Sequence, residues 1–429
     1  MKSFLRSLFT QFHHLNKPAR LFLLALFLDG LLFSGWNLFF NLYIIDAGYS
    51  RDFLGLINAA PSLSGLVLAV PMGLLSDRMG RKRAMILGFI LDNLSIFGQV
   101  LFHAGAWKLV SALFLGAASQ LYFLSQAPFM MRTSDDKSRD ILFSFSFGMF
   151  PLASSLGNIL AGYLPQTFTR WLHLSSSVSA YEATLLFSVS LSFFVLLPII
   201  FIREPKGAEA KIEAASRPKP SLWKALSRPL TLKLALPNLL IGFGAGTLIP
   251  YFNVFFAEHF KLSDSALGIL FSLGSLATGI ACVIGPRLIG NLGGKIRTIT
   301  LGQGISLAFL LLVGFSPWPW LAMVGYVIRG ALMNAVSPLF DAFALEQTHE
   351  SEHGLVNSVR NLAWNVGWTV GPYISGVVQQ RWGFSPLFIN TAVMYALGVA
   401  LTWIMFGRKT ASPPLAPVLP EVESEAISE

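Results

Sequence analysis

The chain has 429 residues, of which 54% are hydrophobic and only 12% are charged, and its formal net charge is +9. Such a small number of charges does not cover the surface of a soluble globular protein of this length, so part of the surface must face lipid. The single cysteine, Cys282, excludes a disulfide framework and a thiolate metal cluster.

Twelve apolar stretches follow one another along the chain. Each has roughly 20 residues, the length that crosses about 30 Å of hydrocarbon as a helix. They are apolar on all sides, unlike the alternating strands of an outer-membrane barrel, so they predict helices. The first stretch is too long for a signal peptide and should be retained. The predicted spans are residues 20–45, 53–75, 84–104, 107–131, 141–164, 179–202, 232–257, 266–289, 297–315, 319–343, 355–380 and 385–407.

The Lys and Arg residues predict how these helices are oriented. When the loops are assigned alternately to two sides, 23 basic residues fall on the side of both termini and five on the other. Because basic loops stay in the cytoplasm, we expect a multi-pass protein of the bacterial plasma (inner) membrane with both termini cytoplasmic. Basic residues spread over many loops do not form a nucleic-acid surface. The five residues on the other side are Arg51, Lys108, Arg170, Lys261 and Arg381.

An internal repeat divides the chain into two halves. A shift of 214 residues overlays them in parallel, since it spans six helices and preserves topology. Parallel halves around an axis along the membrane normal predict a substrate site at their interface, open alternately to each side. The matched pairs are Gly65 with Gly279, Gly80 with Gly294, Arg83 with Arg297, Gly116 with Gly330, Ser144 with Ser358, Gly157 with Gly371 and Gly162 with Gly376.

The expected fold is all-α, a polytopic membrane protein with 12 transmembrane helices in two pseudo-symmetric six-helix bundles. Residues 1–17 place Phe4, Leu5, Leu8, Phe9 and Phe12 at helical spacing, which predicts either an interfacial helix or a frayed terminus. We expect a cytoplasmic segment at 1–19, bundles at 20–202 and 232–407, a charged, proline-containing linker at 203–231 and a disordered tail at 408–429.

The loop at residues 73–83 reads GLLSDRMGRKR and resembles the signature loop of the major facilitator superfamily. With twelve spans and the repeat, the resemblance covers nearly the whole chain. It implies a monomeric transporter without catalytic residues, metal or cofactor, and a cytoplasmic latch at Gly73, Asp77, Arg78, Gly80 and Arg81. In this latch Asp77 meets the positive N-terminal end of the eleventh helix, Gly73 permits close helix contact and Gly80 a tight turn. The alternative is that the basic residues only determine topology.

Two positions depart from the pattern of drug/proton antiporters in this superfamily. Those proteins carry an arginine four residues before a glycine of the fourth helix, where this chain has Ala112 before Gly116. Their fifth-helix signature, Gly-Pro-x-x-Gly-Gly, is reduced to GNILAG at residues 157–162, whereas residues 371–376 keep more of it as GPYISG. In the second half, Asn291 stands where the latch has its acid.

Three ionisable residues stand out inside the predicted spans: Asp29, Asp92 and Arg329. A charge at mid-bilayer costs about 2.5 to 3.5 kcal/mol on insertion scales, so each needs a partner or a wet cavity. In the superfamily the first, fourth, seventh and tenth helices line the cavity, so we expect Asp29 and Arg329 to face each other as coupling or substrate charges. The alternative is a static ion pair. For Asp92 we expect packing or hydrogen bonding.

Amides and aromatic residues of the cavity helices suit an amphiphilic solute, although such side chains also hold membrane helices together. The candidate wall residues are Trp36, Asn37, Asn41, Gln120, Tyr122, Tyr251, Asn253, Asn334, Arg360, Asn361, Trp364 and Asn365. In the seventh helix, Gly242, Gly244 and Gly246, followed by Pro250, predict a gating hinge.

Residues 349–353 read HESEH, which fits the H-E-x-x-H pattern of zinc proteases. The motif lies in a short predicted connector without an evident third ligand, so a solvated polar loop is the better interpretation of His349, Glu350 and His353 than a metal site.

We therefore expect a secondary transporter of a small molecule, working by alternating access among membrane lipids. Export of amphiphilic compounds, coupled to protons, is the first hypothesis. Uptake of a small organic anion or zwitterion is the second, and it is favoured if Arg329 faces the cavity. The alternatives from other classes are a transporter-like sensor and a membrane metalloprotease. No P-loop is present, so the energy does not come from ATP bound by such a loop.

Overall fold

The computed structural model describes the chain except for residues 1–11, 13–14, 204–227, 285–291, 349–352 and 408–429, and its described elements are all helices. The first half contains α2 (Lys17–Leu32) with α3 (Ser34–Asp46), α4 (Arg51–Met79), α5 (Arg81–Leu101), α6 (Gly105–Thr133), α7 (Asp136–Trp171), and α8 (Ser177–Ser192) with η1 (Phe193–Val195) and α9 (Leu196–Phe201). The second half contains α11 (Pro229–Leu248) with η3 (Ile249–Tyr251) and α12 (Phe252–His259), α13 (Asp264–Ile284), α14 (Lys295–Phe315), α15 (Pro319–Glu346), α16 (His353–Trp382) and α17 (Ser385–Phe406).

The predicted all-helical fold is confirmed, and each predicted span coincides with one helical segment of the described chain. Eleven of the helical segments in the described part of the chain are long and apolar enough to cross a membrane. The exception is α16, because its first turns carry Asn357, Arg360, Asn361 and Asn365. These polar residues lower the mean hydropathy of a helix that packs against two other helices, α11 and α4.

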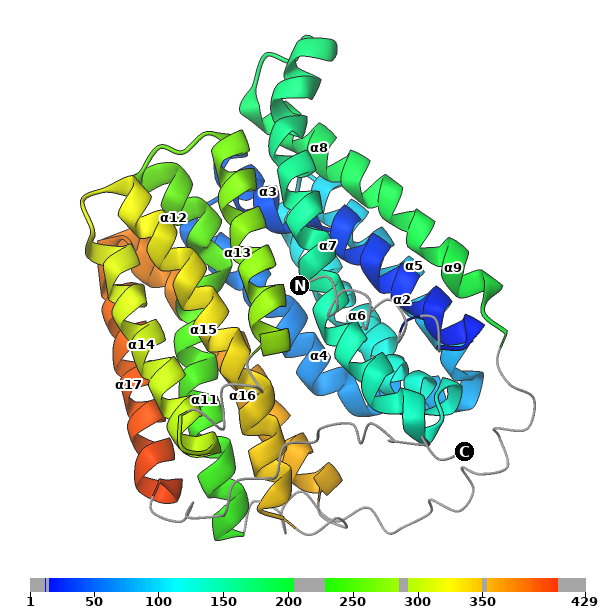
Figure 1. The fold of residues 1–429 in the computed structure, drawn as a ribbon. Helices are drawn as coiled ribbons and strands as arrows, with labels where there is room; N and C mark the ends of the chain where they lie inside the picture. Colours follow the sequence, from blue (N-terminus) through cyan, green and yellow to red (C-terminus); the bar gives the residue numbers. More distant parts are fainter. Residues whose placement is uncertain (1–11, 13–14, 204–227, 285–291, 349–352, 408–429) are drawn as a thin grey trace, which may run out of the picture.

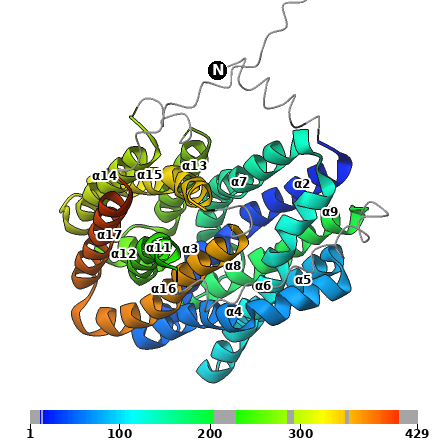
Figure 2. The same ribbon diagram turned by 90° about the horizontal axis from the view of Figure 1, so that it is seen from below.

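The two halves lie side by side as separate bundles (Figure 1). The most extensive contacts between them are those of α13 with α7 and of α16 with α4. Figure 2 shows the same two contacts from below. We call the end of the molecule that contains Gly80 and Gly294 the basic end, since Arg81, Lys82 and Lys295 lie there. The other end, which contains His103 and Gly383, is called the opposite end.

Local sequence explains where several helices begin. The Asn16 side chain accepts a hydrogen bond from Ala19 N at 2.9 Å at the start of α2, and Ser50 accepts one from Phe53 N at 3.2 Å before α4. Such caps satisfy amides that have no partner in the first turn of a helix. Helix α7 begins earlier than predicted because Asp135 forms a capping box, which starts the helix within the connector.

Glycine permits the closest contacts between the two halves. A Cβ on Gly376 of α16 would lie only 2.8 Å from the Cα of Gly55 in α4. A Cβ on Gly162 of α7 would lie 2.9 Å from the Cα of Gly268 in α13. Gly162 and Gly376 are matched by the 214-residue shift, so the repeat appears here as two equivalent crossings. Both crossings lie toward the opposite end.

The same repeat fixes how each half packs internally. A Cβ on Gly157 would overlap the backbone of Leu31 in the first span, and one on Gly371 would lie 2.8 Å from the backbone carbon of Gly246 in the seventh. Equivalent helices therefore approach each other equally closely in both halves, as a parallel repeat predicts.

Several sequence-based interpretations fall on residues outside the described part of the chain. These are the interfacial helix at 1–17 for all but its last residues, most of the linker at 203–231, the tail at 408–429, the loop around Asn291, and His349 with Glu350.

We predict that Gly376→Ala opens the opposite end. The added methyl group forces α16 and α4 apart by roughly 1 Å, because carbon atoms need about 3.5 to 4.0 Å between them. Spin labels at His103→Cys and Pro317→Cys, in a Cys282→Ser background, should give longer and broader distances than in the parent. Gly304→Ala, with no atom within 4 Å of the added Cβ, is the matched control. Unchanged distances in Gly376→Ala would contradict the tight crossing.

Candidate functional site

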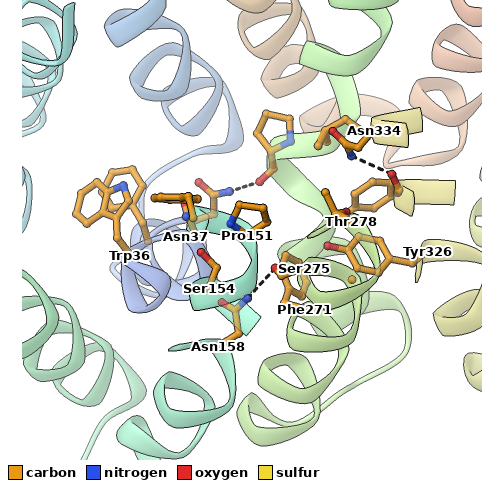
Figure 3. Close-up of a pocket in the computed structure, with 18 of the residues that line it drawn as sticks. Trp36, Asn37, Pro151, Ser154, Asn158, Phe271, Ser275, Thr278, Tyr326 and Asn334 are labelled. Atoms are coloured by element: carbon orange, nitrogen blue, oxygen red, sulfur yellow. Dashed lines mark hydrogen bonds between the residues drawn. The ribbon is translucent and has the colours of Figure 1, made fainter. Parts of the chain in front are cut away.

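A cavity of about 480 Å³ lies between the two halves. Figure 3 shows that side chains of α3 and α7 from one half meet those of α13 and α15 from the other. The lining residues are Trp36, Asn37, Phe40, Asn41, Asn58, Phe150, Pro151, Ser154, Asn158, Ile249, Pro250, Phe252, Phe271, Gly274, Ser275, Thr278, Tyr326, Arg329, Gly330, Asn334 and Trp368.

The wall of this cavity is aromatic and amide-rich, and it carries one charge. Trp36 stacks on Phe40 with ring centroids 4.0 Å apart, and Trp368 enters from α16 in the other half. Among the described lining residues the only ionised side chain is Arg329, and none is an aspartate or glutamate. The site therefore offers flat apolar surfaces, amide groups and a single cation.

Arg329 is 6% exposed and has no carboxylate partner among the ion pairs of the described residues. Its Nη2 donates to Tyr395 Oη at 2.7 Å, while its Nε has no hydrogen-bond acceptor. The guanidinium lies 5.8 Å from the ring of Phe252 and 5.7 Å from that of Tyr395. Aromatic rings stabilise the cation only in part, so its charge lacks full compensation and its buried Nε lacks a hydrogen-bond acceptor.

Asp29 does not pair with Arg329, and the expected pairing of these residues is wrong for this conformation. Asp29 is 9% exposed in α2 and is absent from the cavity wall. Asp29 interacts electrostatically with Asp92 of α5. Asp92 accepts a hydrogen bond from Ser119 Oγ, as expected for a packing residue. The first span breaks at Phe33, between α2 and α3, so only the α3 part of this span reaches the cavity.

Polar contacts between the halves close the opposite end. Arg51 at the start of α4 donates from Nη2 to Glu258 of α12 at 2.6 Å and from Nη1 to Gln379 of α16 at 3.2 Å. Nearer the cavity, Asn253 Nδ2 donates to Leu38 O at 2.9 Å, and Asn158 Nδ2 donates to Ser275 Oγ at 3.2 Å. Figure 3 includes the contact between Asn158 and Ser275.

At the basic end, by contrast, the described ion pairs stay within one half. Asp77 pairs with Arg81 one turn away, and Arg360 donates to Asp341 at 2.6 Å. Lys295 pairs with Glu346, also within the second half. Among the described residues, polar contacts therefore join the halves at the opposite end, whereas the ion pairs of the basic end stay within one half, which is the geometry of a molecule closed at its opposite end.

The predicted latch residues lie where the signature loop was expected. Gly80 has φ of +86°, which only glycine adopts easily, and this fits the predicted tight turn between α4 and α5. The expected close contact at Gly73 is wrong here, because the nearest atom to an added Cβ would be 3.9 Å away. Lys82 donates to the carbonyl oxygens of Ile200 and Ile202, so it caps the end of the sixth span.

The seventh span is interrupted as predicted, but not at its glycines. The break is η3 at Pro250, and Pro250 O accepts a hydrogen bond from Asn41 Nδ2 at 2.6 Å. Gly242 and Gly246 instead lie against the backbone of α16, where an added Cβ would be 3.0 Å and 2.8 Å from carbonyl oxygens. These glycines allow α11 and α16 to pack closely.

Four predicted wall residues line the cavity: Trp36, Asn37, Asn41 and Asn334. The others are absent from the wall, and several of them bind neighbouring helices instead, because a membrane helix satisfies its amides and aromatic rings against whichever neighbour is nearest. Tyr251, for example, donates to Pro372 O at 3.1 Å. The residues absent from the wall are Gln120, Tyr122, Tyr251, Asn253, Arg360, Asn361, Trp364 and Asn365.

Sequence reasoning missed the contribution of the fifth and eighth helices. Ser154 and Asn158 of α7, and Ser275 and Thr278 of α13, line the cavity, whereas no residue of the fourth helix does. A signal was present, since these polar residues lie three or four positions apart on otherwise apolar helices, which places each pair on one helix face.

Comparison with known proteins agrees with this geometry. Residues 22–255 and 234–427 match the family model described as Major Facilitator Superfamily. The chain is 23% identical over 399 residues to "Multidrug resistance protein MdtG" of Dickeya zeae, covering 90% of this chain and 94% of that protein. It is 22% identical over 392 residues to "Multi-drug resistance efflux pump PmrA homolog" of Lactococcus lactis, covering 89% and 93%.

Two solved structures share the fold. The nucleoside transporter NupG superposes with a TM-score of 0.72 at 12% identity, covering 91% of this chain and 100% of that one. A bacterial homologue of the human lysosomal transporter Spinster, in an inward-facing and occupied conformation, gives 0.72 at 14% identity, covering 92% and 97%.

We predict that Arg51→Gln and Glu258→Gln each loosen the opposite end, and that the double variant is no looser than either single variant. The pair is partly exposed, so its coupling energy should be about 0.2 to 1 kcal/mol. Spin labels at His103→Cys and Pro317→Cys report how often the opposite end is open, and the populations of short and long label distances give the coupling energy. Arg381→Gln, at the same end but over Trp382 of its own helix, is the control. Additive effects would show that the two residues act separately.

Proposed function

This chain belongs to the Major Facilitator Superfamily, whose members are transporters and not enzymes, and from this premise we propose that it exports amphiphilic compounds bearing an anionic group. The observation that carries the proposal is Arg329, an unpaired cation in an aromatic cavity between the two halves.

The proposed orientation places the basic end in the cytoplasm of a bacterial cell and the opposite end outside. The excess of Lys and Arg in the loops of the basic end supports it. In this orientation the described conformation is closed to the outside, because Arg51, Glu258 and the two glycine crossings join the halves there. The cavity would then exchange substrate with the cytoplasmic side in this conformation, which both an exporter and an importer adopt during alternating access.

The chemistry of the wall supports an amphiphile. Rings of Trp36, Phe40, Phe271 and Trp368 offer flat apolar contacts, and ligand sites are usually apolar with a few placed polar groups. A guanidinium binds a carboxylate, sulfonate or phosphate by paired, charge-assisted hydrogen bonds. Since no described lining residue is acidic, a cationic drug would meet Arg329 without a compensating carboxylate in this conformation.

The relatives support the proposed direction of transport. MdtG and PmrA are named as multidrug resistance and efflux proteins, and both align along about nine-tenths of this chain. Uptake of a small organic anion or zwitterion is the second candidate, because the position of Arg329 on the cavity wall favours an anion in either direction. The two candidates share a binding site and differ in direction.

We also propose that protons drive the transport and that Asp29 is the residue that exchanges them. A carboxylate in hydrocarbon is costly unless it is neutralised, and Asp29 has no basic partner among the described ion pairs. It lies in α2, one turn before the break at Phe33. A change of charge there acts on the segment that leads into the cavity.

His353, the described histidine of the metalloprotease-like motif, has no role in the proposed transport. His353 begins α16, where its Nε2 lies 3.1 Å from Thr348 O. A sensor that binds ligand without flux remains distinguishable by experiment, since it would show binding and no counterflow.

We predict that Arg329→Gln weakens binding of 2-naphthoate roughly 10- to 100-fold, the cost of one charged hydrogen-bonded contact of about 1.5 to 3 kcal/mol. Binding of 2-naphthamide should change little. Arg360→Gln is the matched control, because Arg360 is equally buried but pairs with Asp341 away from the cavity. Calorimetry on the purified protein measures both ligands. Equal loss for naphthoate and naphthamide would remove charge recognition from the proposal.

We predict that Asp29→Asn abolishes the stimulation of flux by a proton gradient and leaves naphthoate binding within about twofold, because Asp29 is off the cavity wall. Proteoliposomes with and without an imposed gradient measure flux, and Asp92→Asn is the comparison. A gradient effect that persists in Asp29→Asn would assign proton exchange to another residue.

A further inference from the structure

A second concavity lies on the outer surface of the second half, near the basic end. It has a volume of about 500 Å³. Figure 2 shows α11 with α16 and α17 on either side, and this α11–α16 groove is built mainly from the first two. Leu232 and Leu236 on its rim are 46% and 40% exposed, so it opens away from the protein. Its lining residues are Leu232, Lys233, Ala235, Leu236, Leu239, Val359, Leu362, Ala363, Val366 and Met405.

The groove is apolar along its length and cationic at one end. Among its described lining residues only Lys233 is polar, and it lies with Val359 toward the basic end. Leu239 and Val366 lie deeper, roughly 9 Å farther along the helices at 1.5 Å per residue. No ion pair among the described residues involves Lys233. The groove therefore has the polarity of a lipid, with a charged end at the interface and an apolar remainder.

We propose that the α11–α16 groove binds one phospholipid with an anionic headgroup, taken from the leaflet at the basic end. Its phosphate contacts the Lys233 ammonium, and one acyl chain lies between Leu236 of α11 and Leu362 of α16. In hydrocarbon a groove of this volume is filled by lipid, and van der Waals packing holds the chain there. One lysine near the surface favours an anionic headgroup by roughly fivefold.

This lipid would contact the same helix that forms part of the cavity wall. Val366 lines the groove, and Trp368, two residues further along α16, lines the cavity on another face of the helix. Occupancy of the groove is thereby linked to the position of a cavity helix. The lipid site itself depends only on the location of the chain in a membrane, and not on transport.

A second apolar groove of about 660 Å³, between α13 and α15, provides an internal comparison. Its lining residues include Leu273, Ala277 and Trp320, and none is charged. It should accept acyl chains without preference for a headgroup.

Native mass spectrometry of the purified protein, titrated with phosphatidylglycerol or phosphatidylcholine, tests the proposal. The parent protein should bind phosphatidylglycerol roughly fivefold more tightly. Lys233→Gln should bind both lipids equally. Ala363→Trp, which fills the groove, should lose one phosphatidylglycerol, and Leu236→Trp should do the same if the first variant does not fold. Ala277→Trp, in the comparison groove, should keep the preference.

Two results would overturn the proposal: no headgroup preference in the parent protein, or a preference that survives both Lys233→Gln and groove filling. Because the measurement involves no substrate, a protein that fails to transport naphthoate but retains this lipid would separate the two proposals.

Discussion

The rest of the structure depends on the close backbone contact between the two halves at Gly55 with Gly376 and at Gly162 with Gly268. Side chains at these four positions would hold the helices apart, so the opposite end would not close around the ion pair of Arg51 and Glu258. Because each crossing lies beside the cavity, the same contacts determine how far apart its walls stand. A small change at the crossings is therefore transmitted to the whole interface, since packed interiors transmit strain.

The cavity combines two requirements that conflict in a membrane. Apolar and aromatic walls favour an amphiphilic solute, but they also make an unpaired charge expensive. The hydrogen bond to Tyr395 and the contact with the ring of Phe252 offset only part of the cost of the Arg329 charge. Under the proposed function, an anion that enters from the cytoplasm would supply the missing partner, so binding and neutralisation would be one event. Because Asp29 is absent from the cavity wall, the proposed proton site and the proposed substrate site are separate positions.

Much of the fold was predictable because membrane helices obey a simple constraint. Every backbone amide must be satisfied inside the hydrocarbon, so length and hydropathy alone locate the spans. The repeat was also readable, and its glycines Gly162 and Gly376 proved to be the contact points between halves. The wall of the site was less predictable, because helix rotation depends on packing that hydropathy does not encode. Trp36 and Asn41 face the cavity, whereas Tyr251 and Asn253, likewise an aromatic residue and an asparagine, face other helices.

The most direct test of the account is the structure of the purified protein with a brominated aromatic carboxylate bound. The account predicts the bromine among the rings of Trp36, Phe271 and Trp368, with the carboxylate within hydrogen-bond distance of Arg329. A ligand seated outside the interface between the halves, or one whose carboxylate avoids Arg329, would contradict it.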